Sequence, residues 1–213
     1  MDHDFDQAYW ERHWREARIG TTAPAHPYLA EELAGLTPGT ALDAGCGAGA
    51  EALWLAAAGW DVTGADISAE VLARAAERGA AAGLAVRWVE ADLSAWEPDD
   101  AYDLVTTHYA HPAIAQLDFY DRLATWVRPG GTLLIVGHRH THGHGHGHGH
   151  DHGSDDRPPP EASVTAAAVT GRLEAAGWRI ETAVERQRVV AGREAPLDDV
   201  VVRATRVGRI DSA

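Results

Sequence analysis

The stretch "LDAGCGAGA" at residues 42–50 carries the clearest chemical signal in this chain of 213 residues. Gly45, Gly47 and Gly49 alternate within it, and glycine lets a backbone turn sharply and approach a ligand closely. The spacing also fits the glycine pattern of dinucleotide sites. Asp43 distinguishes a dinucleotide from a cationic cofactor. A carboxylate beside the loop repels a diphosphate and attracts an ammonium or sulfonium group. We therefore expect S-adenosylmethionine as the cofactor.

Two acidic residues further along the chain agree with this cofactor. Asp66 ends the stretch "DVTGAD", where a carboxylate can accept hydrogen bonds from both hydroxyls of a ribose. Asp92, in "VEADLS", can accept a hydrogen bond from an adenine amino group. Asp66 suits either cofactor, so it supports a binding crevice without choosing between them. The alternative for each residue is a helix cap or a solvated acid in a loop.

The histidines in "THYAHP", residues 107–112, are candidates for acid–base chemistry. Methyl transfer from a sulfonium requires mainly alignment, but a thiol or hydroxyl acceptor also loses a proton. His108 or His111 could take that proton directly or through water, and Tyr109 could orient the acceptor. The alternative is that His111 only caps or precedes the next helix.

A histidine tract, "GHRHTHGHGHGHGHDHG" at residues 137–153, has histidine at every second position from 138 to 152. Interleaved glycine lets the chain bend, so several imidazole nitrogens can meet one zinc, nickel, cobalt or copper ion. Because many sets of nitrogens are equivalent, a catalytic metal with fixed ligands is disfavoured. Three interpretations stay open: a solvated loop with incidental metal affinity, a metal buffer or sensor, and a lid that recruits the acceptor or responds to pH. The candidate metal ligands are His142, His144, His146, His148 and His150.

Aromatic side chains recur at helical spacing near the N-terminus. One interpretation is that a stripe of them packs against the sheet. The other is a lid that closes over the sulfonium, excludes water and turns ring faces toward the positive centre. Tyr9 and Trp14 are the candidate contacts with the cofactor. The residues concerned, with two weaker candidates on the following segment, are Tyr9, Trp10, His13, Trp14, His26 and Tyr28.

Short β-type runs alternate with alanine-rich helical runs, which predicts a parallel sheet with helices on both faces. After the histidine tract, one helical run leads to two consecutive strands, which predicts a closing antiparallel hairpin. The Pro-Gly-Gly triplet at 129–131 predicts a turn before the fifth strand. The predicted strands cover residues 40–45, 61–66, 86–91, 102–108, 132–138, 178–190 and 198–208, and the predicted helices cover 50–59, 68–83, 112–127 and 162–177.

The composition limits the partners. The chain has 18 basic residues, all arginine, against 32 acidic ones, and its formal charge is −14. Such a surface repels phosphate backbones and anionic membranes. No apolar run is long enough to cross a bilayer, the N-terminus does not resemble a signal peptide, and Cys46 is the single cysteine. We expect a cytoplasmic monomer or homodimer that acts on a small molecule, with no nucleic-acid or membrane partner.

Five stretches in order resemble the motifs of class I S-adenosylmethionine-dependent methyltransferases: "ALDAGCGAG", "VTGADIS", "VEADLS", "YDLVTTHYAH" and "RPGGTLLIVGH". The resemblance implies an α/β, Rossmann-like sheet of seven mostly parallel strands in the order 3-2-1-4-5-7-6, with strand 7 antiparallel. It implies a single domain over residues 1–213, with a lid segment at 1–30 and a His- and Pro-rich loop insertion at 138–160. The start "FDQAYWERHW" is similar, more loosely, to small-molecule enzymes of the tellurite-resistance and thiopurine type.

The resemblance also implies roles for individual positions. The loop at 45–49 would hold the methionine moiety together with Asp43. The next two motifs would hold the ribose and the adenine, and the end of the fourth strand would lie beside the transferred methyl group. The positions implied in these roles are Asp43, Gly45, Cys46, Gly47, Gly49, Asp66, Ile67, Asp92, Leu93, Thr107 and His108.

The sequence thus predicts a methyltransferase that transfers a methyl group from S-adenosylmethionine to a small-molecule nucleophile, with a slight preference for a thiol. The alternative is a metal-binding or metal-handling protein that uses the methyltransferase scaffold and the histidine tract. A dinucleotide-dependent reductase is disfavoured by Asp43.

Overall fold

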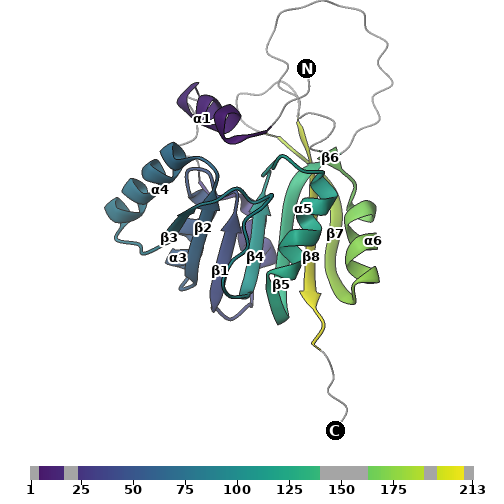
Figure 1. Ribbon diagram of the computed structural model, residues 1–213. Helices are drawn as coiled ribbons and strands as arrows, with labels where there is room; N and C mark the ends of the chain where they lie inside the picture. Colours follow the sequence, from purple (N-terminus) through teal and green to yellow (C-terminus); the bar gives the residue numbers. More distant parts are fainter. Residues whose placement is uncertain (1–4, 17–23, 140–162, 190–195, 209–213) are drawn as a thin grey trace, which may run out of the picture.

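The computed structural model describes residues 5–16, 24–139, 163–189 and 196–208. One sheet connects all of its strands in the order β3-β2-β1-β4-β5-β8-β7, and a short strand, β6, pairs with β5 outside that path (Figure 1). The strands are β1 Thr40–Ala44, β2 Asp61–Asp66, β3 Arg87–Glu90, β4 Tyr102–His108, β5 Val127–Arg139, β6 Ser163–Val164, β7 Trp178–Arg188 and β8 Leu197–Arg206. The helices are α1 Gln7–Glu16, α2 Pro27–Glu32, α3 Ala50–Ala57, α4 Ala69–Ala82, α5 Gln116–Thr125 and α6 Ala166–Ala175.

The predicted strand order and the antiparallel strand are confirmed. Strands β1 to β5 pair in parallel, whereas β8 runs antiparallel to both β5 and β7. The two strands of the predicted hairpin are β7 and β8, and they occupy the positions expected for the sixth and seventh strands. Because β1 lies between β2 and β4, successive connections diverge at its carboxyl end, where ligands bind in open α/β sheets.

Three element boundaries differ from the sequence prediction by four or five residues, and the others by two residues or fewer. Helix α5 starts at Gln116 rather than at residue 112, because Ala115 has an extended backbone with ψ 134° and residues 112–115 form a loop. Strand β5 runs through the predicted turn, and Gly130, with φ 83°, lies where its pairing with β4 shifts register. Residues 163–164 pair with β5, and Thr165 then caps α6 by accepting a hydrogen bond from the Ala168 amide.

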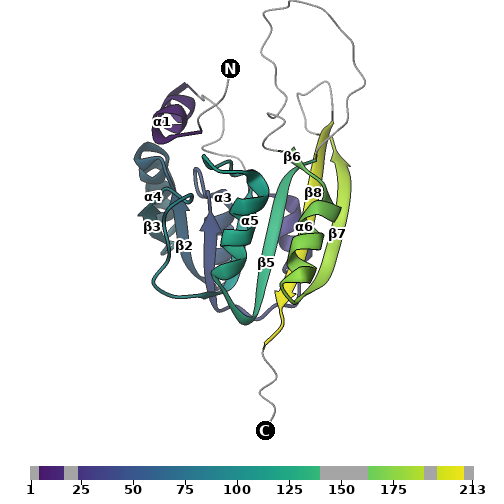
Figure 2. The same ribbon diagram turned by 45° about the vertical axis from the view of Figure 1, so that its right-hand side comes forward.

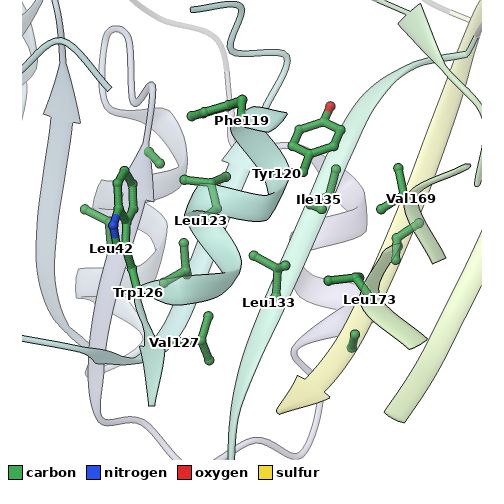
Figure 3. Close-up of a cluster of buried hydrophobic side chains, with 14 of the residues drawn as sticks. Leu42, Phe119, Tyr120, Leu123, Trp126, Val127, Leu133, Ile135, Val169 and Leu173 are labelled. Carbon is green, nitrogen blue, oxygen red and sulfur yellow. The ribbon is translucent and has the colours of Figure 1, made fainter. Parts of the chain in front are cut away.

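Apolar side chains cover both faces of the sheet. On one face, α5 and α6 contribute Phe119, Leu123 and Leu173 to a cluster that includes strand residues such as Leu133 and Ile135 (Figure 3). A second cluster joins residues of α2 and α3 to β1, β2 and β4. Figure 2 shows the helices α5 and α6 in front of the sheet and α1 above the end at which β1 and β2 finish. None of the helices in the described ranges is long and apolar enough to span a bilayer.

Candidate cofactor and acceptor site

A cavity of about 860 Å³ opens at the carboxyl ends of β1, β2, β4 and β5. Its walls come from the loop after β1, the ends of β2 and β5, the loops after β3 and β4, the lid helix α1 and the hairpin of β7 and β8. Residues of β1 to β3 and their loops form one half, which we call the cofactor half. His26, the end of β4 with the loop after it, and residues of β5, β7 and β8 form the other, which we call the acceptor half.

The glycine loop forms the floor of the cofactor half. The amides of Gly45 and Cys46 both donate to the Ala65 carbonyl, at 2.8 and 3.0 Å, which ties the loop to β2. Gly45 has φ 79° and Gly47 has φ 48°, conformations that favour glycine. A Cβ atom on Gly45 would lie 2.3 Å from the Cβ of Ala110. Glycine here therefore permits both the turn and the close approach of the loop after β4.

Gly49 has a different role from the one predicted. It does not line the cavity, and a Cβ atom there would lie 2.6 Å from the Trp88 ring and 3.0 Å from Ala75. With φ 78° it precedes α3 as its N-cap. The third glycine of the motif is therefore needed for packing against Trp88 and for the start of α3, not for contact with a ligand.

Asp66 shapes the glycine loop as well as the cavity wall. Its carboxylate accepts hydrogen bonds from the amides of Gly47 and Ser68, at 2.9 and 3.0 Å. The side chain lines the cavity and is almost completely buried, and burial raises the pKa of Asp66 above its ordinary value. Ile67, the next residue, also lines the cavity. The predicted ribose position is therefore occupied by a carboxylate that already holds the loop.

Asp43 does not line the cavity, which differs from the direct contact expected with the cofactor. It is 1% exposed, and its Oδ2 has no hydrogen-bond partner. Burial, and then the neighbouring Glu51 carboxylate, raise the pKa of Asp43 well above its ordinary value. Glu51, in the first turn of α3, lines the cavity and accepts a hydrogen bond from the His26 amide at 2.9 Å. Glu51 is thus the carboxylate at the cavity surface beside the loop, and its place one residue after the motif was the available sequence signal.

Replacing Asp43 with asparagine is expected to stabilise the empty protein at neutral pH. The raised pKa means that the ionised Asp43 opposes folding, and this cost is absent below the pKa of the unfolded chain, near 3.8. An amide of the same shape removes the cost, so the melting temperature at pH 7 should rise by about 2–4 °C, which corresponds to roughly 1 kcal/mol. Thermal unfolding between pH 4 and pH 8 measures this. A difference from the wild type that does not grow with pH would contradict the assignment.

The loop after β3 has one exposed and one buried residue of interest. Asp92 Oδ1 accepts hydrogen bonds from the amide and the hydroxyl of Ser94, at 2.9 and 2.6 Å, so Asp92 acts as a turn-forming acid in this loop. Both Asp92 and the buried Leu93 line the cavity. Their position fits the predicted adenine edge, and the Oδ1 contacts agree with the alternative of a loop acid. The two roles are compatible because they use different oxygens.

Helix α1 covers the cavity instead of packing on the sheet. None of its residues is buried, yet four of its aromatic side chains line the cavity. Most of its contacts are with α4, and Gln7 donates to Glu90 of β3 at 3.0 Å. Arg74 of α4 donates to the Trp14 carbonyl at 3.0 Å, and the Trp14 ring lies 3.0 Å from where a Cβ on Gly47 would be. Tyr9 and His13 stack with ring centroids 6.3 Å apart. The aromatic side chains of this segment thus lie at the cavity wall and are not buried against the sheet, and the lid stays a prediction.

The end of β4 separates two residues that were predicted to act together. Thr107 is 1% exposed, does not line the cavity and donates to the Ala44 carbonyl at 2.8 Å, so it joins β4 to β1. His108 lines the cavity, and its buried Nε2 has no hydrogen-bond partner among the residues that the structure describes. Burial lowers the pKa of His108 to about 3. His108 is therefore a neutral imidazole at physiological pH.

His111 is oriented by Gln116, a residue that the sequence did not suggest. The amide nitrogen of Gln116 donates to the Ala110 carbonyl at 3.0 Å, which leaves its oxygen to accept from His111 Nδ1 at 3.2 Å. This arrangement puts the proton on Nδ1 and a lone pair on Nε2. Burial lowers the pKa of His111, and its ring lies 5.3 Å from the His138 ring in a stacked arrangement. This geometry is compatible with both alternatives for His111, a position before the next helix and a base.

The hydroxyl of Tyr109 is engaged inside the protein and is not available to orient an acceptor as predicted. It donates to Asp199 Oδ1 at 2.8 Å, accepts from Arg188 Nη2 at 3.1 Å, and lies 3.2 Å from His26 Nε2. His26 Nδ1 accepts from the Tyr28 amide, so its proton is on Nε2, which donates to Tyr109. Tyr109 also has φ 56°, an uncommon backbone conformation for a residue with a side chain. These contacts hold the loop after β4 in place.

The candidate metal ligands His142, His144, His146, His148 and His150 lie outside the described residues. Within the described ranges, no group of three or more histidine, cysteine, aspartate or glutamate side chains is arranged to hold a metal ion. His138, at the start of the tract, is the member that the structure describes, and it lines the acceptor half. Cys46 is buried at the cavity wall, where burial raises the pKa of its thiol.

Comparison with known proteins agrees with this geometry. Residues 41–131 match a family described as a methyltransferase domain. The structure reported for the conversion of a disulfide bond into a thioacetal group during echinomycin biosynthesis is 26% identical, with a TM-score of 0.66, over 97% of this chain and 92% of that one. The chain contains a class I S-adenosylmethionine-dependent methyltransferase domain. The methyltransferase fold extends beyond the matched residues, because TehB from Haemophilus influenzae aligns over 94% of this chain and 66% of its own, with 17% identity and a TM-score of 0.66.

The curated relatives match this chain over only part of their own length. The ribosomal RNA small subunit methyltransferase C of Alcanivorax borkumensis is 37% identical over 109 residues, which is 48% of this chain and 33% of that protein. The chain spans a third to about a half of the length of the curated relatives that it matches. The cavity residues fit the methyl donor of the family, since a glycine cradle, cavity-lining carboxylates and an aromatic lid suit an adenosine joined to a cationic amino acid.

Proposed function

We propose that this protein transfers the methyl group of S-adenosylmethionine to the sulfur of a small-molecule thiol. The observation that carries the proposal is the division of the cavity: carboxylates and glycines in one half, and neutral imidazoles and ring side chains in the other. The solved structure at 26% identity supports sulfur as the nucleophile, because it concerns the conversion of a disulfide bond into a thioacetal group. We also propose that the chain is a single domain, since its strands share one sheet.

Each half has a defined task in this proposal. Gly45, Gly47, Glu51 and Asp66 would hold the cofactor, and Tyr9 and Trp14 would cover it and exclude water. When bound, S-adenosylmethionine supplies an electrophilic methyl group on a sulfonium. The acceptor sulfur gains that methyl group and loses its proton, so the products are a thioether, S-adenosylhomocysteine and a proton.

The acceptor half would take up the proton. His111 Nε2 carries a lone pair because Gln116 holds the proton on Nδ1, and it can accept a hydrogen bond from the thiol. His108 would support the acceptor from the end of β4 through its unpartnered Nε2. The lowered pKa values of both residues keep them neutral at pH 7, and a neutral imidazole can accept a proton.

The decisive test combines binding and turnover. Calorimetry should detect S-adenosylmethionine binding, and S-adenosylhomocysteine release should be faster with thiols than with the matched alcohols. Binding without release from any thiol would refute the proposed nucleophile while leaving the cofactor assignment intact. Absence of cofactor binding would refute the proposal as a whole.

Replacing His111 with phenylalanine is expected to lower kcat/KM for a thiol by about 100-fold, because the ring contacts remain and the proton acceptor is lost. Burial lowers the pKa of His111 below its ordinary value of 6.5, so its contribution should be constant between pH 7 and pH 8 and should fall at a lower pH than that of an ordinary histidine. Turnover measured across that pH range for His111→Phe and for His108→Gln checks this. Unchanged turnover in both variants would exclude either histidine as the base.

A further inference from the structure

The one arginine among the described cavity-lining residues, Arg188 of β7, is neutralised within the protein. Its Nε donates to Asp199 Oδ2 at 2.9 Å, and its Nη2 donates to the Tyr109 hydroxyl at 3.1 Å. Asp199 of β8 is 0% exposed, whereas the Arg188 side chain is 23% exposed. The carboxylate therefore lies beneath the guanidinium and cancels its charge at the surface that an acceptor meets.

Three of the described histidines at the acceptor half, His26, His108 and His111, are uncharged at neutral pH. Burial lowers the pKa of His26 to about 4 and that of His108 to about 3, and it also lowers the pKa of His111. The other charged residues lining the described cavity are Glu51, Asp66 and Asp92, all in the cofactor half. These carboxylates attract a cationic cofactor and repel an anion bound beside it.

We propose that Asp199 is a specificity-determining residue: by neutralising Arg188 it makes the acceptor half select uncharged acceptors over anionic ones. Asp199 accepts hydrogen bonds from Arg188 Nε and from the Tyr109 hydroxyl. An acceptor carboxylate that reaches the Nη groups of Arg188 therefore meets a guanidinium whose charge is already balanced, and it gains no net attraction. The fully buried Asp199 cannot move into water without disrupting the pairing of β8. This inference rests on the proposed function, because it concerns the acceptor of that reaction.

The test uses two thiols of matched shape, 3-mercaptopropanamide and 3-mercaptopropanoate, which differ in charge. The wild type should show a kcat/KM at least tenfold higher for the amide. Asp199→Asn should reverse this preference, because it exposes an uncompensated guanidinium, and the double variant Arg188→Gln with Asp199→Asn should restore it. Since the same two thiols are used on every variant, their intrinsic reactivities cancel in the comparison.

A second variant avoids the buried ion pair. Leu197, at the start of β8, lines the cavity and is partly exposed, so Leu197→Arg adds a cation there without touching Asp199. It should shift the preference toward the carboxylate by tenfold or more, whereas Leu197→Gln should not. If the wild type and Leu197→Arg show the same preference for the amide over the carboxylate, the proposal is overturned. This comparison remains valid even if Asp199→Asn does not fold.

Calorimetry of both thiols against the protein saturated with S-adenosylhomocysteine separates this inference from the proposed function. If neither thiol is methylated but the affinities follow the predicted order, the selection by charge stands and the thiol nucleophile is wrong. If the thiols are methylated with the same preference in every variant, the function stands and the selection is refuted. If no variant binds or methylates either thiol, the proposal is also refuted.

Discussion

Replacing Gly45 with alanine should abolish cofactor binding, with a loss of affinity of roughly 100-fold or more. The alanine Cβ would lie 2.3 Å from the Cβ of Ala110, so either the glycine loop or the loop after β4 must move. The backbone at φ 79° adds a strain of about 1–3 kcal/mol for a residue with a side chain. Because the two loops form the boundary between the cofactor and acceptor halves, their displacement affects both.

Gly83 is a matched control for this substitution. It ends α4 with φ 67°, and a Cβ atom there would meet nothing within 4 Å. Gly83→Ala therefore carries a similar backbone strain without the steric overlap and lies outside the cavity. Calorimetry with S-adenosylmethionine and thermal unfolding of both variants should show loss of stability in each, and loss of binding in Gly45→Ala alone. Equal binding by the two variants would refute the role of close packing at Gly45.

Replacing Asp199 with alanine should destabilise the protein by about 3–5 kcal/mol, because it leaves Arg188 without its buried partner. The substitution also removes the acceptor of the Tyr109 hydroxyl at 2.8 Å. Tyr109 would then lose the contact that holds its uncommon backbone conformation next to His108. Urea unfolding, analysed from the midpoint and the slope, measures the change in the free energy of unfolding.

The neighbouring Asp198 provides the control. It accepts from Arg139 at 3.0 Å and from Gln187 at 3.1 Å, but its side chain is 24% exposed and its partners lie near the surface. Asp198→Ala should therefore cost about 1 kcal/mol or less. If both variants lose the same free energy of unfolding, burial is not what makes the Arg188–Asp199 pair important.

Much of the fold follows from local features of the chain. Ser68 accepts from the Val71 amide at the start of α4 and Gly83 ends this helix, as the cap and breaker residues indicate. The predicted limits of β2 and β4 coincide with those observed, since apolar runs between glycines and polar residues define short buried strands. The resemblance to the methyltransferase family then supplied the strand order, which periodicity does not contain.

The glycine motif was also predictable, because the end of β1, the turn and the start of α3 follow one another directly in the sequence. Asp66 was predictable as the last residue of β2. Which side chains of the motif reach the cavity was decided by tertiary packing. Gly49 is needed because the Trp88 ring lies 2.6 Å from the position of its absent Cβ, and Trp88 belongs to β3. Asp43 is buried while Glu51 reaches the surface, because the β1 residue lies between β2 and β4 in the sheet.

The acceptor half shows what only the tertiary structure decided. Tyr109 meets His26 and Asp199, which are 83 and 90 positions away in the sequence. Spacing predicts contacts within a helix or strand, whereas these contacts arise because antiparallel β8 lies beside β5 and brings its first residues to the carboxyl end of β4. The sequence by itself determined the fold class and the cofactor loop, since those depend on residues adjacent in the chain. The carboxylate that faces the cavity beside that loop was decided by packing, because Asp43 is buried and Glu51 lines the cavity. The tertiary structure determined the charge of the acceptor half. Burial lowers the pKa values of His26, His108 and His111, and the pairing of β7 with β8 places Asp199 against Arg188.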